Sequence, residues 1–429
     1  MSVRDLSNDE ILDHLKSNTI FRNQQLSILI KLLNSIKDST TLAIDGSWGS
    51  GKTVFVKQLC MLADENVNDY GRNTLDEDAI KKLRTDQKIF YFNAWEQDYI
   101  GDAVSALLLK LIADNDPSLQ LESMKRAANM INLSAGIKNL THDFINIEAQ
   151  TSQEKLVTEV KKLVNRHEAI SRFIDDLRGD KKRLIFIIDE LDRCKPTFAI
   201  DLLEVIKHYF NRDDVTFIIA TNMRELSHTV QKYYGYNFDG YAYLNKFVDY
   251  AISLKKVDTH DYAQKILDWN LNYGGDEAAE NVIKYLNFEM REINAYYSAL
   301  KLITNFVRKD NNWNHSQYPI QLIFVPFALG LKLRGYDDYN KFVAGEGAEL
   351  LSEFLEKTET RLDLADGSAV NSETTQSQQK KAAIDNLVSQ YQQLITQTDV
   401  KHGRENLKDF NDAISLIGSY TTIIDEIQE

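Results

Sequence analysis

One stretch near the start of the chain, Leu42-Ala-Ile-Asp-Gly-Ser-Trp-Gly-Ser-Gly-Lys-Thr53, restricts the possible folds more than any other. From Gly46 to Thr53 it matches the pattern G-x-x-x-x-G-K-[ST], the P-loop or Walker A motif. Phosphate oxygens must approach this backbone closely, so Gly46, Gly49 and Gly51 are expected to exclude a Cβ and to permit positive φ. Successive backbone N–H groups and the positive end of the following helix then bind the anion.

Every position of this loop is a candidate nucleotide contact. Lys52 can reach the β- and γ-phosphates, and the Thr53 hydroxyl is expected to bind Mg²⁺. The flanking sequence fits this chemistry, because residues 41–44 have the pattern of an apolar strand and residues 54–62 that of a helix. The predicted cofactor-binding residues are Gly46, Ser47, Trp48, Gly49, Ser50, Gly51, Lys52, Thr53 and Val54.

A second acidic motif follows an apolar run much later in the chain. Residues 185–188 are apolar and lead directly into Asp189 and Glu190, which is the Walker B pattern. Asp189 is expected to hold Mg²⁺, directly or through water. Glu190 can orient and deprotonate a water molecule aimed at the γ-phosphate, whereas in a kinase this position would serve a bound acceptor. Together the two motifs predict nucleotide hydrolysis, with Lys52 and Glu190 as catalytic residues.

Four further polar residues are candidates for the same site. Asn222, at the end of a later strand, either senses the γ-phosphate or the attacking water, or only caps the next helix. Asn93 ends an earlier strand and is placed to hold Glu190 away from water until a partner binds. Arg193 and Lys246 can each neutralise phosphate charge, in cis or across an interface, and structural ion pairs are the alternative for both.

The hydrophobic pattern alternates between strands and helices. The near-continuous apolar run at 183–188 is typical of a central strand in a parallel sheet with helices on both faces. Short connections favour a parallel, doubly wound α/β sheet, with a helical insertion at about 117–182 between the two Walker motifs. The predicted strands are 41–44, 88–93, 183–188, 215–220 and 250–254, and the helices around them are 54–62, 103–112, 223–233 and one that begins at 196.

Outside this core the pattern is mostly helical. Ser7 and Glu10 form a capping box that predicts the first helix of a helical segment over 6–36. Residues 155–183 mix basic residues with Glu and Asp, so we interpret them as a solvated helical face rather than a nucleic-acid patch. The predicted regions are a P-loop core at 1–258, a lid-like helical region at 259–365, a polar, disordered connector at 366–381 and C-terminal helices at 382–429.

Charge and composition narrow the partners and the compartment. A net charge of −14 disfavours a broad nucleic-acid or anionic-membrane surface. The N-terminal residues are polar, and the longest apolar run, at 322–331, is too short to span a bilayer, so neither a signal peptide nor membrane association is expected. Two distant cysteines fit a reducing cytosol, and a cytoplasmic location is expected.

The base is predicted to be adenine. A GTPase normally carries [NT]-K-x-D on a late strand, and the nearest candidate, Lys255-Lys256-Val257-Asp258, lacks the Asn or Thr. ATP is therefore preferred to GTP.

Taken together, these motifs resemble the KAP family of P-loop NTPases over about residues 20–310. The resemblance is carried by the Trp-Gly pair inside Gly46–Thr53, by Phe92-Asn93-Ala94-Trp95-Glu96, and by the extended Walker B segment Ile188–Pro196. Tyr243-Leu244-Asn245-Lys246-Phe247 resembles the family's Tyr-Leu-Glu-Lys motif, with Asn245 in place of Glu. Met290 replaces the Pro of an Asn-Pro-Arg motif before Arg291, and Asn222 stands where many members have Asp.

The resemblance implies a Mg²⁺-dependent ATPase whose nucleotide state changes its shape or assembly. It implies a homo-oligomer, because related sites often borrow an Arg from a neighbour, and a protein partner that the residues do not identify. Bacterial members resemble components of phage-defence systems and animal members resemble signalling scaffolds. Many members carry transmembrane helices between the Walker motifs, but this chain is polar there. The alternatives are a slow nucleotide switch that recruits a partner and, less favoured, a nucleic-acid-stimulated ATPase.

Overall fold

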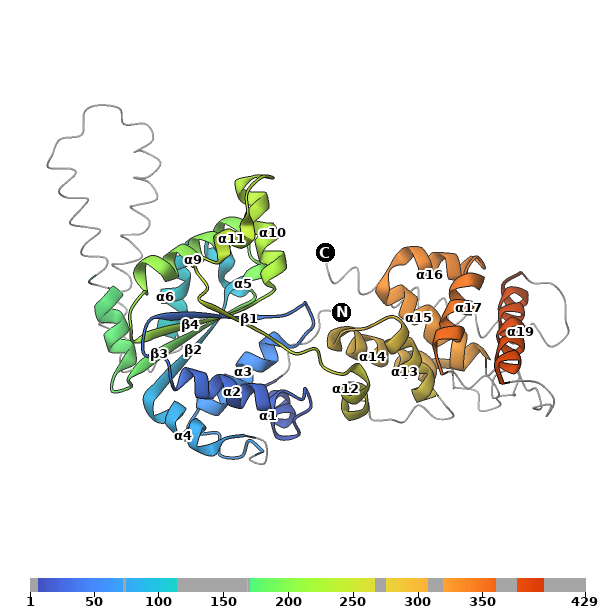
Figure 1. Ribbon diagram of the computed structural model, residues 1–429, viewed down its shortest axis with the longest axis horizontal. Helices are drawn as coiled ribbons and strands as arrows, with labels where there is room; N and C mark the ends of the chain where they lie inside the picture. Colours follow the sequence, from blue (N-terminus) through green and yellow to red (C-terminus); the bar gives the residue numbers. More distant parts are fainter. Residues whose placement is uncertain are drawn as a thin grey trace, which may run out of the picture. The chain divides into compact units, whose positions relative to one another are not determined.

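The computed structural model describes residues 7–71, 75–113, 168, 170–266, 275–307, 319–359 and 376–396. The chain divides after Lys255 into two compact units, drawn in Figure 1. The unit that ends at Lys255 contains the sheet, and the unit that begins at Lys256 is helical. Most of the expected insertion at 117–182, and the helices expected beyond residue 396, lie outside the described residues.

The sheet has five strands in the order β2-β3-β4-β1-β5, and every neighbouring pair is parallel. This confirms the predicted parallel α/β sheet. Strand β4 lies between β3 and β1, so its end separates the two Walker motifs. The strands are β1 (Thr40–Asp45), β2 (Gln87–Asn93), β3 (Arg183–Asp189), β4 (Val215–Thr221) and β5 (Tyr250–Ser253).

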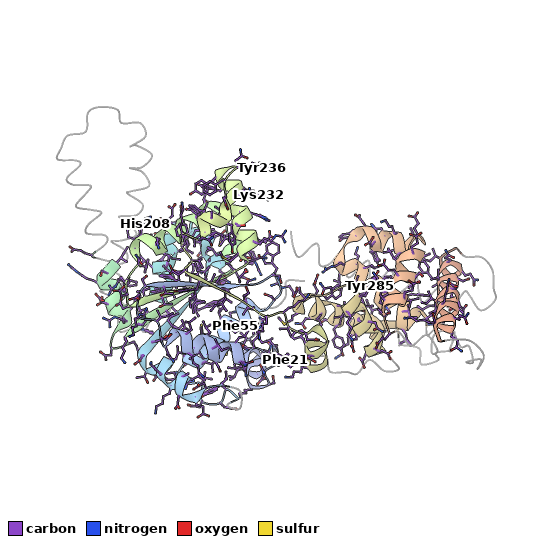
Figure 2. All side chains as sticks on the ribbon, viewed as in Figure 1. Phe21, Phe55, His208, Lys232, Tyr236 and Tyr285 are labelled. Atoms are coloured by element: carbon purple, nitrogen blue, oxygen red, sulfur yellow. The ribbon has the colours of Figure 1, made fainter. Side chains whose placement is uncertain are left out.

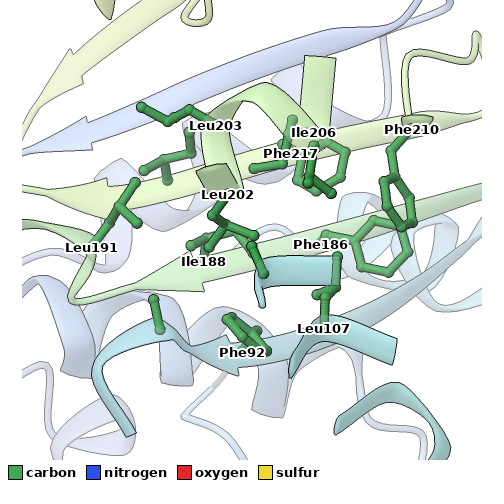
Figure 3. Packing of buried hydrophobic residues seen from close by; sticks show 14 of the residues in the cluster. Phe92, Leu107, Phe186, Ile188, Leu191, Leu202, Leu203, Ile206, Phe210 and Phe217 are labelled. Carbon is green, nitrogen blue, oxygen red and sulfur yellow. The ribbon is translucent and has the colours of Figure 1, made fainter. Parts of the chain in front are cut away.

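Alternate residues of each central strand point to opposite faces, and both faces are buried. On one face Phe186, Ile188 and Phe217 pack with residues of the helices that follow β2 and β3 (Figure 3). On the other face Ile185 and Ile187 pack with the N-terminal helices. All seven residues of β3 and of β4 are buried, which explains their continuous apolar sequence.

The helices of this unit form two layers, one on each face of the sheet (Figure 1). One layer comprises α1 (Asn8–Lys16), α2 (Asn23–Leu33), α3 (Lys52–Ala63) and α4 (Glu77–Asp86). The other comprises α5 (Ala94–Gln97), η2 (Asp98–Ile100), α6 (Ala103–Ala113), residues 170–178, η4 (Leu191–Arg193), α9 (Pro196–Tyr209), α10 (Met223–Tyr234) and α11 (Gly240–Leu244). The predicted capping box is present, since the Ser7 and Glu10 side chains each bond the other's backbone N–H.

The helical unit has a separate aromatic core. Phe327 stacks on Phe354 with ring centroids 4.5 Å apart, and Phe342 stacks on Tyr391 at 4.6 Å. The Tyr391 hydroxyl donates to the Phe342 carbonyl, which ties α19 to α16. The helices are α12 (Thr259–Ile266), α13 (Gly275–Tyr285), α14 (Met290–Val307), the π-helical turn η6 (Ile320–Phe324), α15 (Val325–Arg334), α16 (Tyr336–Val343), α17 (Ala348–Lys357) and α19 (Gln376–Thr396).

One expected boundary differs from the structure. Helix α19 begins at Gln376, so residues 376–381 are helical rather than part of a disordered connector. Gln, Lys and Ala are good helix formers, and a Ser/Thr/Gln-rich composition does not by itself exclude a helix. Residues 366–375 lie outside the described part of the chain.

Candidate nucleotide site

The P-loop connects β1 to α3 and curves through two left-handed glycines. Gly49 has φ 80° and Gly51 has φ 84°, a region that Gly enters without the steric cost of a Cβ. Gly46 is different, because its φ is not positive. A Cβ on Gly46 would lie 2.6 Å from Ser50 Oγ, so crowding rather than backbone handedness requires glycine there.

Lys52 lies in the first turn of α3 and folds back onto the loop. Its Nζ donates to the carbonyl oxygens of Gly46 at 2.7 Å and Ser47 at 3.0 Å. Burial lowers the pKa of Lys52, and nearby carboxylates, with Asp192 first, act in the opposite direction. A phosphate would offer this ammonium stronger acceptors than the two neutral carbonyls that it now contacts.

The strand register brings the two Walker motifs to one edge of the sheet. Asp189 ends β3, and its carboxylate is 1% exposed. Thr53 of the P-loop helix lies near this carboxylate and helps to lower its pKa. The Tyr91 hydroxyl donates to Asp189 Oδ2 at 2.9 Å, and the Glu190 backbone N–H donates to Oδ1 at 2.9 Å. Burial is the main cause that raises the pKa of Asp189, while these hydrogen bonds lower it.

Glu190 occupies a strained position immediately after β3. Its backbone is left-handed, with φ 60° and ψ 28°, which is uncommon for a residue with a Cβ. The carboxylate forms an ion pair with Arg193 at 2.8 Å and accepts from Asn93 Nδ2 at 3.4 Å. Arg193 also lies over the Trp95 ring, 5.4 Å from its centroid. Glu190 is thus restrained from two sides.

Two asparagines at strand ends cap the helices that follow. Asn93 Oδ1 accepts from the backbone N–H groups of Trp95 and Glu96, while its Nδ2 donates to Glu96 Oε1 at 3.0 Å and, over a longer distance, to Glu190. Asn222 follows the last residue of β4, and its Oδ1 accepts from Glu225 N at 3.3 Å. The Nδ2 of Asn222 has no hydrogen-bond partner among the described residues, so the cap leaves a donor available at the sheet edge.

Three residues that the sequence did not single out contribute to the site. Asp192 and Tyr91 bond residues of the two Walker motifs. Arg22, which is 2% exposed, donates to the Ser50 carbonyl at 2.6 Å and to the Lys255 carbonyl at 3.0 Å. Tyr91 has a sequence signal, because in β2 it alternates with Phe90 and Phe92 and so faces the helix layer that contains α3. Arg22 has no comparable sequence signal, because a charged residue before an apolar helix is common.

The other predicted phosphate-neutralising cation, Lys246, contacts an aromatic ring. Lys246 is exposed, and its Nζ lies 5.6 Å from the centroid of the Tyr243 ring. Arg291 is exposed on α14, which belongs to the helical unit. Exposed aromatic side chains also gather around α10, where Tyr236 is 91% exposed and Lys232 lies near it (Figure 2). Lys232 belongs to α10 and Tyr236 to the segment that follows it. The P-loop contacts described above come from other elements.

The donor set fits a hydrated divalent cation. Among the described residues, no group of three or more His, Cys, Asp or Glu side chains is arranged around a common point. The side chain of Thr53 nevertheless lies near the carboxylate of Asp189. One carboxylate and one hydroxyl, completed by phosphate oxygens and water, suit Mg²⁺, which keeps much of its water shell.

Three features define a P-loop nucleotide-binding domain. They are a glycine loop between a strand and a helix, a lysine in the first turn of that helix, and a buried aspartate two strands away. The chain belongs to the KAP family of P-loop NTPases, since the KAP family P-loop domain matches residues 22–314. The chain is also 31% identical over 137 residues to an uncharacterized protein of Methanocaldococcus jannaschii; the match covers 32% of this chain and 63% of that protein. Within the described residues, no helix combines the length and apolar character needed to cross a membrane.

Proposed function

We propose that the protein binds ATP with Mg²⁺ at the P-loop and hydrolyses it. The observation that carries this proposal is the proximity of Thr53 to Asp189, which places the Walker A and Walker B motifs at one sheet edge. Lys52 supports the same conclusion, because this buried residue lies near three carboxylates and, among the described residues, its ammonium donates only to neutral carbonyls. Binding of a triphosphate satisfies this charge.

Each residue of the site then has a distinct task. Lys52 neutralises the β- and γ-phosphates, and the amides of the loop from Gly46 to Val54 bind their oxygens. Asp189 and Thr53 would hold Mg²⁺, which supplies positive charge to the phosphates when it is bound. Glu190 orients a water molecule and accepts its proton as the water attacks the γ-phosphate. The Asn222 amide donates to the γ-phosphate or to that water.

The observed pairing of Glu190 supports a regulated enzyme. Each oxygen of this carboxylate is engaged, one by Arg193 at 2.8 Å and the other by Asn93 at 3.4 Å, and these partners reduce its capacity to accept a proton from water. Hydrolysis therefore requires these contacts to loosen. This restraint also favours our second candidate function, a slow nucleotide switch that stays loaded with ATP and recruits a protein partner. Turnover stimulated by a partner distinguishes the enzyme from the switch.

Nucleotide binding is tested first, on the full chain. We expect a fluorescent ATP analogue to bind in the presence of Mg²⁺ and ATP to displace it more effectively than GTP. Lys52→Ala should abolish binding, and Lys81→Ala, an exposed lysine of α4, should leave it unchanged. Equal binding by the Lys52→Ala variant and the wild type would refute the proposed site. Stronger displacement by GTP would refute the choice of base.

Assembly and biological role are tested separately. We expect light-scattering mass to rise with ATP and Mg²⁺, as the proposed nucleotide-dependent homo-oligomer requires, and a constant mass would refute it. A role in phage defence remains a prediction from the family resemblance. It requires that the wild type lower phage plating on a bacterial host and that Lys52→Ala fail to do so. ATPase activity stimulated by DNA or RNA, and lost as salt rises, would instead support the nucleic-acid alternative.

A further inference from the structure

The tip of the P-loop is attached to the loop that follows the Walker B strand. Trp48, the third residue of the loop, is 51% exposed, yet its indole Nε1 donates to Asp192 Oδ2 at 2.6 Å. Asp192 lies in η4, directly after Glu190, and is buried. A short hydrogen bond from an indole to a buried carboxylate is charge-assisted, and such bonds are stronger than those between neutral groups.

The second oxygen of the same carboxylate is also bonded. Asp192 Oδ1 accepts from the hydroxyl of Thr221, which is fully buried at the end of β4. Asp192 thus connects the loop after β1, the loop after β3 and the end of β4, the strand between them. With one oxygen held by the rigid strand end, the other is fixed in position to hold Trp48.

Arg22 attaches the P-loop at the Ser50 carbonyl, and the bond from Trp48 adds a second attachment nearer its tip. Gly49 and Gly51, which follow Trp48, allow many backbone conformations in a loop that must present its N–H groups in a single arrangement. Within the loop itself, Ser50 N donates to the Ser47 carbonyl at 3.2 Å, and this bond does not fix Trp48 to the remainder of the fold. The bond to Asp192 does.

We propose that Asp192 is a positioning residue that holds the P-loop in its phosphate-binding conformation through Trp48. It acts through the indole and need not touch the nucleotide. This role rests on the nucleotide binding proposed above, which it deepens by naming a residue that determines affinity for the phosphates.

A double-mutant cycle tests the contact. Asp192→Ala and Trp48→Phe are each expected to weaken ATP affinity about tenfold, the scale of one lost hydrogen bond to a charged group. The double variant should be no weaker than either single variant, because both remove the same contact. Asp192→Asn keeps an oxygen that can accept from the indole and should recover most of the affinity. Asp180→Ala, at an exposed position, is the matched control and should bind as the wild type does.

Amide hydrogen exchange without nucleotide separates this role from the proposed function. We expect exchange over 46–53 to accelerate in Asp192→Ala and Trp48→Phe but not in Asp180→Ala. Unchanged exchange in Asp192→Ala overturns the positioning role, whether or not the wild type binds ATP. Faster exchange with unchanged ATP affinity also overturns it, because the loop would then be held without consequence for binding. A wild type that does not bind nucleotide, despite faster exchange in the variants, refutes the proposed function and reduces the contact to a structural one.

Discussion

Replacement of Asp189 by Asn should stabilise the nucleotide-free protein while it abolishes use of Mg²⁺-bound ATP. Burial is the main cause that raises the pKa of Asp189 above its ordinary value of 3.8. A carboxyl group whose pKa is raised on folding binds its proton more tightly in the folded state than in the unfolded chain. Its ionisation therefore lowers the free energy of unfolding above that pKa, and a tenfold difference in proton affinity between the two states corresponds to about 1.4 kcal/mol.

The surroundings of Asp189 can accept a neutral amide. The Asn oxygen can take the hydrogen bond from the Glu190 backbone N–H, and its amide group can donate to the hydroxyl oxygen of Tyr91, since hydroxyl groups both donate and accept. The Tyr91 hydroxyl then changes from donor to acceptor, and each heavy atom of this set keeps one hydrogen-bond partner. We expect the free energy of unfolding to rise by about 1–2 kcal/mol, as for other buried charges that are replaced without loss of packing. For a unit of this size, this corresponds to an increase in Tm of about 2–8 °C.

Thermal unfolding in EDTA measures this change, with the exposed Asp180→Asn variant as the control. The difference between Asp189→Asn and wild type should be largest near neutral pH. It should shrink as the pH falls toward 3.8, because the wild-type carboxyl then becomes neutral as well. With Mg²⁺ and ATP at about 100 times the Kd, the wild type should gain about 2.7 kcal/mol and the variant much less. A variant that is less stable than wild type in EDTA, or a difference that does not depend on pH, would refute the reasoning.

Further predictions concern the restraint on Glu190, the cap at Asn222 and the cysteines. Arg193→Ala breaks the ion pair with Glu190 and should raise basal ATP turnover several-fold in a phosphate-release assay; a loss of turnover would instead support a phosphate-neutralising role. Asn222→Asp keeps the oxygen that caps α10 but removes the free amide donor, so Tm should change little while turnover falls; equal turnover would reduce Asn222 to a cap. Burial raises the pKa of the Cys60 thiol to about 12, which leaves about one thiolate in ten thousand at pH 8. Burial likewise raises the pKa of Cys194, so both thiols should react slowly with Ellman's reagent until guanidinium unfolds the protein, and rapid labelling of the native protein would contradict this.

The sheet could be predicted from the sequence because its signals are local. The continuous apolar runs that became β3 and β4 reflect strands with both faces buried, and their observed bounds lie within one residue of those expected. The P-loop motif predicted the phosphate site for the same reason. Its glycines, Lys52 and Thr53 are neighbours in the sequence, so the motif alone brings them together. At Gly46 the motif predicted the absence of a Cβ but not its cause, because the crowding by Ser50 depends on the path of the loop.

Contacts between distant segments could not be predicted in this way. Trp48 and Asp192 are 144 positions apart in the sequence. They meet because the loops after β1 and β3 lie at the same edge of the sheet, on either side of the end of β4. Asn93 lies beside the Walker B acids because the register of β2 and β3 pairs it with Asp189. The sequence pattern does not specify strand order or register, so Asn93 was a hypothesis and Asp192 was not singled out. The buried Arg22 depends in the same way on the positions of Ser50 and Lys255.

The central claim is that Glu190 activates water for hydrolysis of ATP bound at the P-loop. Single-turnover hydrolysis of radiolabelled ATP, with protein in excess, tests it most directly in wild type and Glu190→Gln. We predict that the variant binds ATP within about threefold of wild type but converts it to ADP at least about 100-fold more slowly, because it lacks the base. Equal rates of conversion in the two proteins, or a wild type that binds ATP and never cleaves it, would contradict the account.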